Sequence, residues 1–130
     1  RDVWGAIEYK VPGYFIAGGA GITPFIAILR QLHKDNKLQG NKLLFSNKTA
    51  ADIIYESELA EMLGDNFINI LSKEKNSKYQ YGHINEDFLK KEVADFSVHF
   101  YVCGPDKMIS DINDILVKQG ATPDNVVFEK

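Results

Sequence analysis

The sequence contains little cysteine and no long apolar run. Its single cysteine, Cys103, excludes an internal disulfide framework and a cysteine-based zinc or iron–sulfur site. The apolar stretches are short and interrupted by glycine, so none is long enough to cross a bilayer. Residues 1–4 lack the charged and apolar regions of a signal peptide. These absences predict a cytoplasmic protein that does not contact a membrane.

Positive charge is not in excess either. The 15 Lys and Arg residues stand against 18 Asp and Glu residues, giving a formal net charge of −3, so we expect no broad basic face for nucleic acid. The three histidines, His33, His83 and His99, lie far apart without ligand spacing, and no metal site is expected. There is no initiator methionine, which is expected of a fragment or a processed chain.

What is present fits one globular domain. A length of 130 residues, with 45% hydrophobic and 25% charged residues, is ordinary for a single folded unit and argues against disorder. Short apolar runs alternate with segments of helical periodicity, and this order is typical of a parallel sheet with helices on both faces. The strands are expected at residues 13–17, 43–45, 67–71, 98–102 and 126–128. The polar segment 72–82 is expected to be an exposed excursion.

A glycine-rich segment follows the first expected strand. Residues 18–24 read GGAGITP, with three glycines within four positions. Glycine permits a close approach of ligand to backbone, and Thr23 and Pro24 suit the N-cap and first position of a helix. Such a helix start can bind a pyrophosphate, although the pattern departs from the Gly-x-Gly-x-x-Gly fingerprint. A tight strand-to-helix turn without a ligand explains the glycines equally well.

A second segment repeats this arrangement. Residues 101–105 read YVCGP and run from a strand through glycine into a helix. Two such loops at the carboxyl ends of parallel strands are typical of a ligand site at a topological switch point. Cys103 would lie at a helix N-terminus, where a thiol becomes more acidic. Alternatively, it is a small buried hydrophobic residue, the commoner environment of a lone cysteine.

Together these motifs resemble the pyridine-nucleotide domain of the ferredoxin–NADP reductase family, more narrowly its bacterial flavodoxin/ferredoxin reductase-like branch. The resemblance rests on FIAGGAGITPF at residues 15–25 and on YVCGP with Met108, and covers about residues 12–129. It implies a three-layer α/β fold with a five-stranded parallel sheet of order 3-2-1-4-5. Residues 13–130 would be the NAD(P)-binding domain. Residues 1–12 would be a linker, or the end of an N-terminal FAD-binding β-barrel absent from this chain.

The resemblance also implies roles for single residues. Cys103 would place the nicotinamide against the flavin. Glu129 would match an acid near the flavin, although the terminal aromatic residue of some relatives is absent; the alternative is that Glu129 is a solvated terminal charge. Ser46 and Lys48 would contact the adenosine ribose, which favours NADPH over NADH, unless Lys48 is only a solvated loop charge. The full cofactor-binding set is Gly18, Gly19, Gly21, Ile22, Thr23, Pro24, Ser46, Lys48, Cys103, Gly104, Pro105 and Met108.

The implied activity is passage of hydride from NAD(P)H to FAD, with electrons going on to ferredoxin, flavodoxin or a similar acceptor. The alternative is a non-catalytic nucleotide-binding regulatory module, because the chain has no Arg-x-x-Ser/Thr flavin-binding segment at Arg1 or Arg30. A Gly21→Val substitution is expected to abolish nucleotide binding and leave the fold largely intact.

Overall fold

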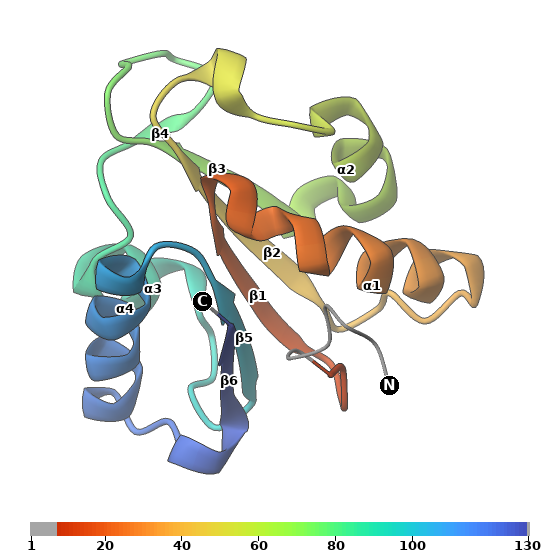
Figure 1. The fold of residues 1–130 in the computed structure, drawn as a ribbon, viewed down its shortest axis with the longest axis vertical. Coiled ribbons are helices and arrows are strands. Elements are labelled where there is room, and N and C mark those ends of the chain that lie inside the picture. Colours follow the sequence, from red (N-terminus) through yellow and green to blue (C-terminus); the bar gives the residue numbers. More distant parts are fainter. Residues whose placement is uncertain (1–7, 130) are drawn as a thin grey trace.

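The strands form one parallel sheet. The computed structural model describes residues 8–129, and the side chains of residues 8–127. All neighbouring strands pair in parallel, in the order β4-β3-β2-β1-β5-β6 (Figure 1). Their bounds are β1 Gly13–Gly18, β2 Lys42–Asn47, β3 Phe67–Leu71, β4 Gln80–Tyr81, β5 His99–Cys103 and β6 Val126–Glu129.

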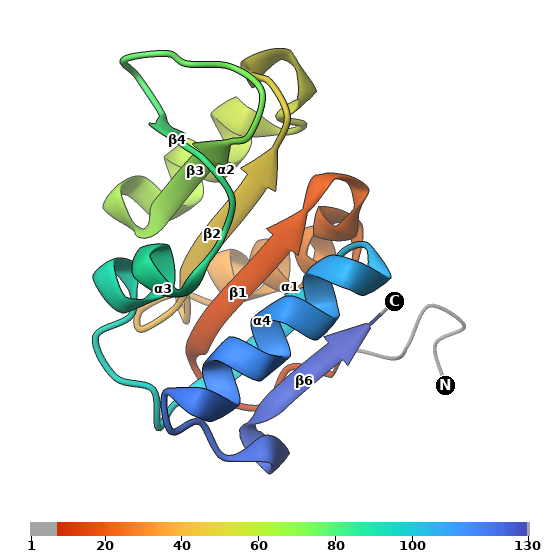
Figure 2. The same cartoon turned by 90° about the vertical axis from the view of Figure 1, so that its left-hand side faces the viewer.

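Helices cover both faces of this sheet. The α-helices are α1 Thr23–Lys34, α2 Glu56–Leu63, α3 Glu86–Glu92 and α4 Asp106–Lys118. Short 3-10 turns occupy Gly19–Ile22, Ala50–Asp52, Gly64–Asn66 and Pro123–Asn125. The apolar residues of α1 and α2 share one core cluster, and those of α3 and α4 share the other. Figure 2 shows α3 and α4 in front of the sheet, with α1 and α2 behind it. The expected three-layer α/β fold is confirmed.

The strand count differs from the expectation by one. The five expected strands have the order 3-2-1-4-5, and a sixth strand, β4, adds to the edge of β3 through the pairs Ile70↔Gln80 and Leu71↔Tyr81. Because β4 is two residues long and lies in the polar excursion, it carries no alternating pattern that sequence reasoning could detect.

Two helix starts differ from their predictions. Residues Gly19–Ile22 form a 3-10 turn, so Ile22 is the N-cap of α1 and Thr23 is its first residue, without a side-chain capping bond. The sequence TAAD at residues 49–52 matches a capping box and predicts that a helix opens there. The capping box between Thr49 and Asp52 is present, but it closes a 3-10 turn. The helix α2 begins only at Glu56, after Tyr55 with φ 58°. The capping box was therefore predicted correctly, whereas the Thr23 N-cap and the type of helix that follows the capping box were not.

The segment before β1 packs on the domain. Tyr9 stacks on Phe15 with the ring centroids 6.1 Å apart and joins the core cluster beneath α1 and α2. Residues 1–7 lie outside the described residues, as does the part of the expected linker that falls there, Trp4 included. Within the described residues, no helix has both the length and the apolar character that crossing a membrane requires.

Candidate functional site

The two glycine segments contact each other directly. They follow β1 and β5, which are neighbours with Ala17 paired to Cys103. A Cβ atom on Gly21 would collide with the carbonyl oxygen of Cys103 and lie 2.9 Å from Cα of Gly104. The two loops therefore pack backbone against backbone. Any side chain at position 21 must displace the Cys103–Gly104 backbone, which counts against the expectation that Gly21→Val leaves the fold largely intact.

Met108 fills the space beneath the same loops. A Cβ atom on Gly18 would collide with Sδ of Met108, and a Cβ atom on Gly104 would lie 3.0 Å from that sulfur. Met108 is half-buried in the first turn of α4, and Pro105 is the exposed N-cap of that helix. These contacts place Gly18, Gly104, Pro105 and Met108 in one packed junction. A side chain at Gly18 or Gly104 would therefore have to displace the end of the Met108 side chain.

Gly19 differs from these glycines. Its φ is +55°, a left-handed conformation that favours glycine, and a Cβ atom there would meet no atom within 4 Å. Thr23 is exposed nearby, Pro24 is half-buried and Ile22 is fully buried in the core. The backbone at Gly19 is therefore open to a ligand, whereas the buried side chain of Ile22 packs the end of the 3-10 turn against the core.

The sheet topology places this junction at a switch point. From β1 the chain passes through α1 to β2 on one side, and from β5 it passes through α4 to β6 on the other. The arrowheads in Figure 2 point in one direction, so the starts of α1 and α4 lie at the same edge of the sheet. Unpaired N–H groups and positive dipole ends at helix starts favour an anion. In open α/β sheets ligands bind at such points.

Cys103 belongs to the core. It is 4% exposed and lies in the cluster that includes Phe15 and Tyr101. This burial supports the alternative in which the side chain packs as a small hydrophobic group. The backbone of Cys103 pairs with Glu129 of β6, so the strand positions of the two expected catalytic residues are adjacent. The side chain of Glu129 lies outside the described residues.

A polar group of residues lies at the end of β2, at the same edge of the sheet. Ser46 is half-buried and Lys48 is exposed, and between them Asn47 is 6% exposed. Nδ2 of Asn47 is buried without a hydrogen-bond partner in the described part of the chain. A buried donor without an acceptor costs about 1–3 kcal/mol. A ligand that accepted a hydrogen bond from Nδ2 of Asn47 would remove this cost. The family resemblance matched the segment 46–48 to the adenosine ribose but gave a role only to Ser46 and Lys48, because the residue type of Asn47 does not show that its amide is buried.

Lys73 is a second residue that sequence reasoning missed. The backbone N–H of Lys73 donates to the carbonyl of Lys48 at 2.9 Å, and that of Ser72 donates to Asn47 at 3.0 Å. The hydrogen bonding between β2 and β3 thus continues beyond both strands and joins the backbones of two exposed lysines. The sequence did contain a signal for Lys73. Ser-Lys follows the third expected strand much as Ser-Asn-Lys follows the second, and neighbouring parallel strands end at the same edge of a sheet.

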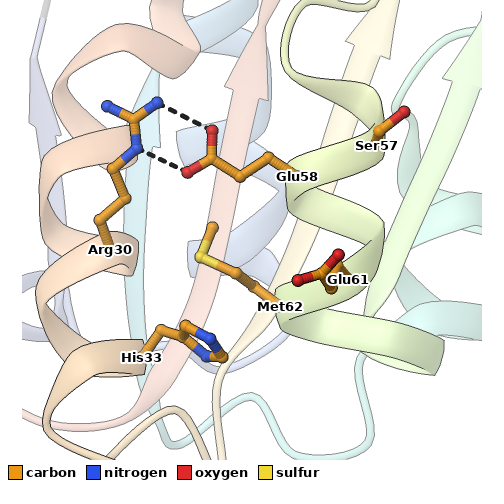
Figure 3. A pocket seen from close by; sticks show the side chains of 6 residues that line it. All are labelled: Arg30, His33, Ser57, Glu58, Glu61 and Met62. Atoms are coloured by element: carbon orange, nitrogen blue, oxygen red, sulfur yellow. Dashed lines mark hydrogen bonds and ion pairs between the residues drawn. The ribbon is translucent and has the colours of Figure 1, made fainter.

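A pocket of about 320 Å³ lies between α1 and α2, away from the glycine loops (Figure 3). Arg30 donates two hydrogen bonds to Glu58 there, at 2.7 and 2.8 Å. This pairing lowers the pKa of Glu58 and raises the pKa of Arg30. Arg30 lies two turns into α1, which runs from the glycine turn toward the opposite edge of the sheet. The pocket therefore lies between two helices and away from the switch point.

A second pocket of about 440 Å³ lies between α2 and the outer side of β3. The hydroxyl of Tyr79 donates to Glu56 at its rim, and this bond, helped by burial, raises the pKa of Tyr79. Oδ1 of Asn69 is buried there without a partner in the described residues. Across residues 8–129, no group of three or more His, Cys, Asp or Glu is arranged to hold a metal ion.

Residues 15–114 match the model of the oxidoreductase NAD-binding domain. The chain belongs to this family. Its β1 glycine segment and most of α4 lie within the matched residues, which confirms the resemblance to the pyridine-nucleotide domain of ferredoxin–NADP reductases.

Relatives and solved structures of this family are longer than the chain. It is 30% identical to NADPH–cytochrome P450 reductase of Drosophila melanogaster over 90% of its length, and spans 19% of that protein. Its fold matches the flavohem-like FAD/NAD-binding domain of nitric oxide dioxygenase from Vibrio cholerae, with TM-score 0.84 and 24% identity, over 95% of this chain and 52% of the other. It also matches a ferredoxin–NADP+ reductase from Neisseria gonorrhoeae solved with FAD and NADP, with TM-score 0.76 and 20% identity, over 89% and 54% of the chains.

Proposed function

We propose that this NAD-binding domain holds NAD(P)H for hydride transfer to an FAD on an N-terminal flavin domain, from which electrons pass to ferredoxin, flavodoxin or a similar acceptor. The observation that carries the proposal is the backbone contact between Gly21 and Cys103–Gly104 at the switch point of a chain belonging to the NAD-binding family. Residues 13–130 would be the nucleotide domain. Residues 1–12 would lead from the flavin domain.

The chain's own residues would bind and orient the nucleotide. The open backbone at Gly19 and the exposed Thr23 at the start of α1 would hold the pyrophosphate, supported by the dipole of that helix. The Cys103–Gly104 backbone would border the nicotinamide, because no side chain projects from Gly104. When bound, the reduced nicotinamide supplies a hydride that a flavin can accept. The protein supplies orientation, which can contribute several kcal/mol to the barrier.

The residues at the end of β2 fit an adenosine ribose that carries a 2′-phosphate. Lys48 and Lys73 are exposed and adjacent, and the buried Nδ2 of Asn47 has no hydrogen-bond partner within the described residues. Two lysines attract a phosphate dianion, whereas a free 2′-hydroxyl is usually bound by an Asp or Glu, which does not occur among residues 46–48. NADPH is therefore the preferred nucleotide in this proposal.

Titration of the chain with NADPH and NADH tests the nucleotide site. Lys48→Asp removes a charge-assisted contact and adds repulsion, so we expect the Kd for NADPH to rise about 10- to 100-fold. The Kd for NADH should change by less than about 3-fold, which is under 1 kcal/mol. Isothermal titration calorimetry measures both.

Lys37→Asp is the matched control. Lys37 is exposed in the loop that precedes β2, at the opposite edge of the sheet, so the same charge change there should leave both Kd values unaltered. An equal loss of NADPH and NADH affinity in Lys48→Asp would show that the ribose lies elsewhere. Nucleotide binding by a natural protein that never reduces a flavin would support the regulatory module instead.

A further inference from the structure

The hydroxyl of Tyr101 is fully engaged with the segment that precedes β1. It accepts hydrogen bonds from the backbone N–H groups of Lys10 and Val11, each at 3.1 Å, and donates to the carbonyl of Val11 at 2.7 Å. A phenol has one proton and two acceptor positions, so this group has no capacity left. Because Tyr101 is 0% exposed, its hydroxyl binds the backbone of Lys10 and Val11 from inside the core.

Neighbouring residues hold the same segment. The Tyr9 ring lies 5.7 Å from that of Tyr101, centroid to centroid, and its hydroxyl accepts from Nδ2 of Asn41 at 3.3 Å. Asn41 is 1% exposed, and its Oδ1 accepts from the N–H of Gly13 at 3.1 Å. We call Tyr9, Lys10, Val11, Asn41 and Tyr101 the entry clasp. Its members fix the path by which the chain enters the domain.

The clasp shares a strand with the candidate site. Tyr101 and Cys103 are two residues apart on β5, and both side chains belong to the core cluster beneath α1 and α2. A rigid strand therefore joins the clasp to the Cys103–Gly104 loop. Any domain that precedes residue 8 in the chain would be positioned relative to that loop through Tyr101. Packing alone does not require this arrangement, since phenylalanine would fill the same space without the three hydrogen bonds.

We propose that Tyr101 is a positioning residue for hydride transfer, which it serves by fixing the entry segment relative to the nicotinamide loop. This inference rests on the proposed function. Tyr101 contacts neither nucleotide nor flavin in this role. Tyr101 acts on the distance between the nicotinamide ring and the flavin ring. Loss of its hydroxyl therefore slows hydride transfer and leaves nucleotide affinity unchanged.

Tyr101→Phe tests the clasp in two steps. In this chain, amide hydrogen exchange at Lys10 and Val11 should accelerate by at least about 10-fold, because both N–H groups lose their acceptor. In the complete natural protein with its flavin, rapid-mixing kinetics should show flavin reduction by NADPH slowed about 10- to 100-fold, since a displacement of about 1 Å can cost 10²-fold. The Kd for NADPH should stay within about 3-fold, a change below 1 kcal/mol.

Tyr14→Phe is the matched control. The Tyr14 hydroxyl accepts from the N–H of Ala94 at 3.0 Å, and its ring packs with the α3 and α4 cluster, so the variant loses a tyrosine hydrogen bond away from the clasp. It should leave flavin reduction unchanged. If flavin reduction were slowed to a similar degree in both variants, the cause would be a general loss of stability. That result would overturn the positioning role of Tyr101.

The remaining outcomes separate the two proposals. Unaltered exchange at Lys10 and Val11 in Tyr101→Phe overturns the clasp itself. Faster exchange with normal flavin reduction overturns the positioning role while leaving the proposed function standing. A natural protein that binds no flavin overturns the proposed function and the positioning role with it, and the exchange measurement still decides the clasp.

Discussion

Glycines in the two loops serve different physical purposes. Gly21 has no side chain because the backbone of Cys103 and Gly104 occupies the place where its Cβ would lie. Gly19 has none because its φ is +55°, and the space beside it is open. Both look alike in sequence, as members of one glycine-rich run. Only the first is a packing requirement, so substitution at the two positions should have different consequences.

Gly21→Ala should destabilise the domain more than Gly19→Ala. We expect the free energy of unfolding to fall by about 2–3 kcal/mol at Gly21, where a methyl group forces the backbone of a packed junction apart. At Gly19 the left-handed conformation alone costs about 1–2 kcal/mol. Urea denaturation followed by circular dichroism measures both values. Equal losses would show that the Gly21 contact relaxes freely.

The other candidate residues differ in how deeply their side chains are buried. Ile22 and Cys103 are buried in the core, where their side chains pack among apolar neighbours. Thr23 and Lys48 are exposed and can reach a ligand directly. Residue type indicated chemistry at all four positions. It could not indicate burial, which depends on how the two loops and α1 pack together.

Ion pairs and hydrogen bonds tie several elements together at the scale of the fold. Glu92, 12% exposed at the end of α3, accepts from Lys42 of β2 at 3.1 Å and from Gln80 of β4 at 2.9 Å. Burial alone would raise the pKa of Glu92, but these two partners outweigh it and hold the pKa below its usual value. The two-residue strand β4 is thereby joined to α3 as well as to β3.

Glu92→Gln should lower the free energy of unfolding by about 1–2 kcal/mol at pH 7, as expected for weakening hydrogen bonds to a charged group. Because the pKa is lower in the folded state, ionised Glu92 stabilises the fold above the unfolded-state pKa of about 4.3. This contribution disappears as the pH falls through the folded-state pKa. Urea denaturation at pH 7 and near pH 3 should therefore show a smaller wild-type advantage at pH 3 than at pH 7.

Glu61→Gln provides the comparison for this change. Glu61 is exposed on α2, and its replacement should alter stability by less than about 0.5 kcal/mol at either pH. An advantage of wild type over Glu92→Gln that is as large at pH 3 as at pH 7 would mean that the shape of the side chain, and not its ionisation, decides the role of Glu92.

For the molecule as a whole, nucleotide binding should stabilise the fold. A ligand that binds only the folded state at 100 times its Kd adds about 2.7 kcal/mol. For a domain of this length we expect NADP+ to raise the thermal midpoint by roughly 10 °C. FAD should leave the midpoint unchanged, because the flavin site is proposed to lie on another domain. Differential scanning fluorimetry with each compound measures both, and a shift with FAD alone would place a flavin site within this chain.

The sequence by itself determined the layered α/β architecture, the strands of the central sheet and the two glycine loops, because hydrophobic periodicity and glycine placement are local signals. It did not determine β4, the 3-10 turn before α1 or the type of helix that follows the capping box, since each depends on competing backbone hydrogen bonds. Only the tertiary structure showed the backbone hydrogen bond between Lys73 and Lys48 and placed the Tyr101 hydroxyl on Lys10 and Val11. These contacts join residues 25 and about 90 positions apart, and such distances in sequence are bridged only when the sheet assembles.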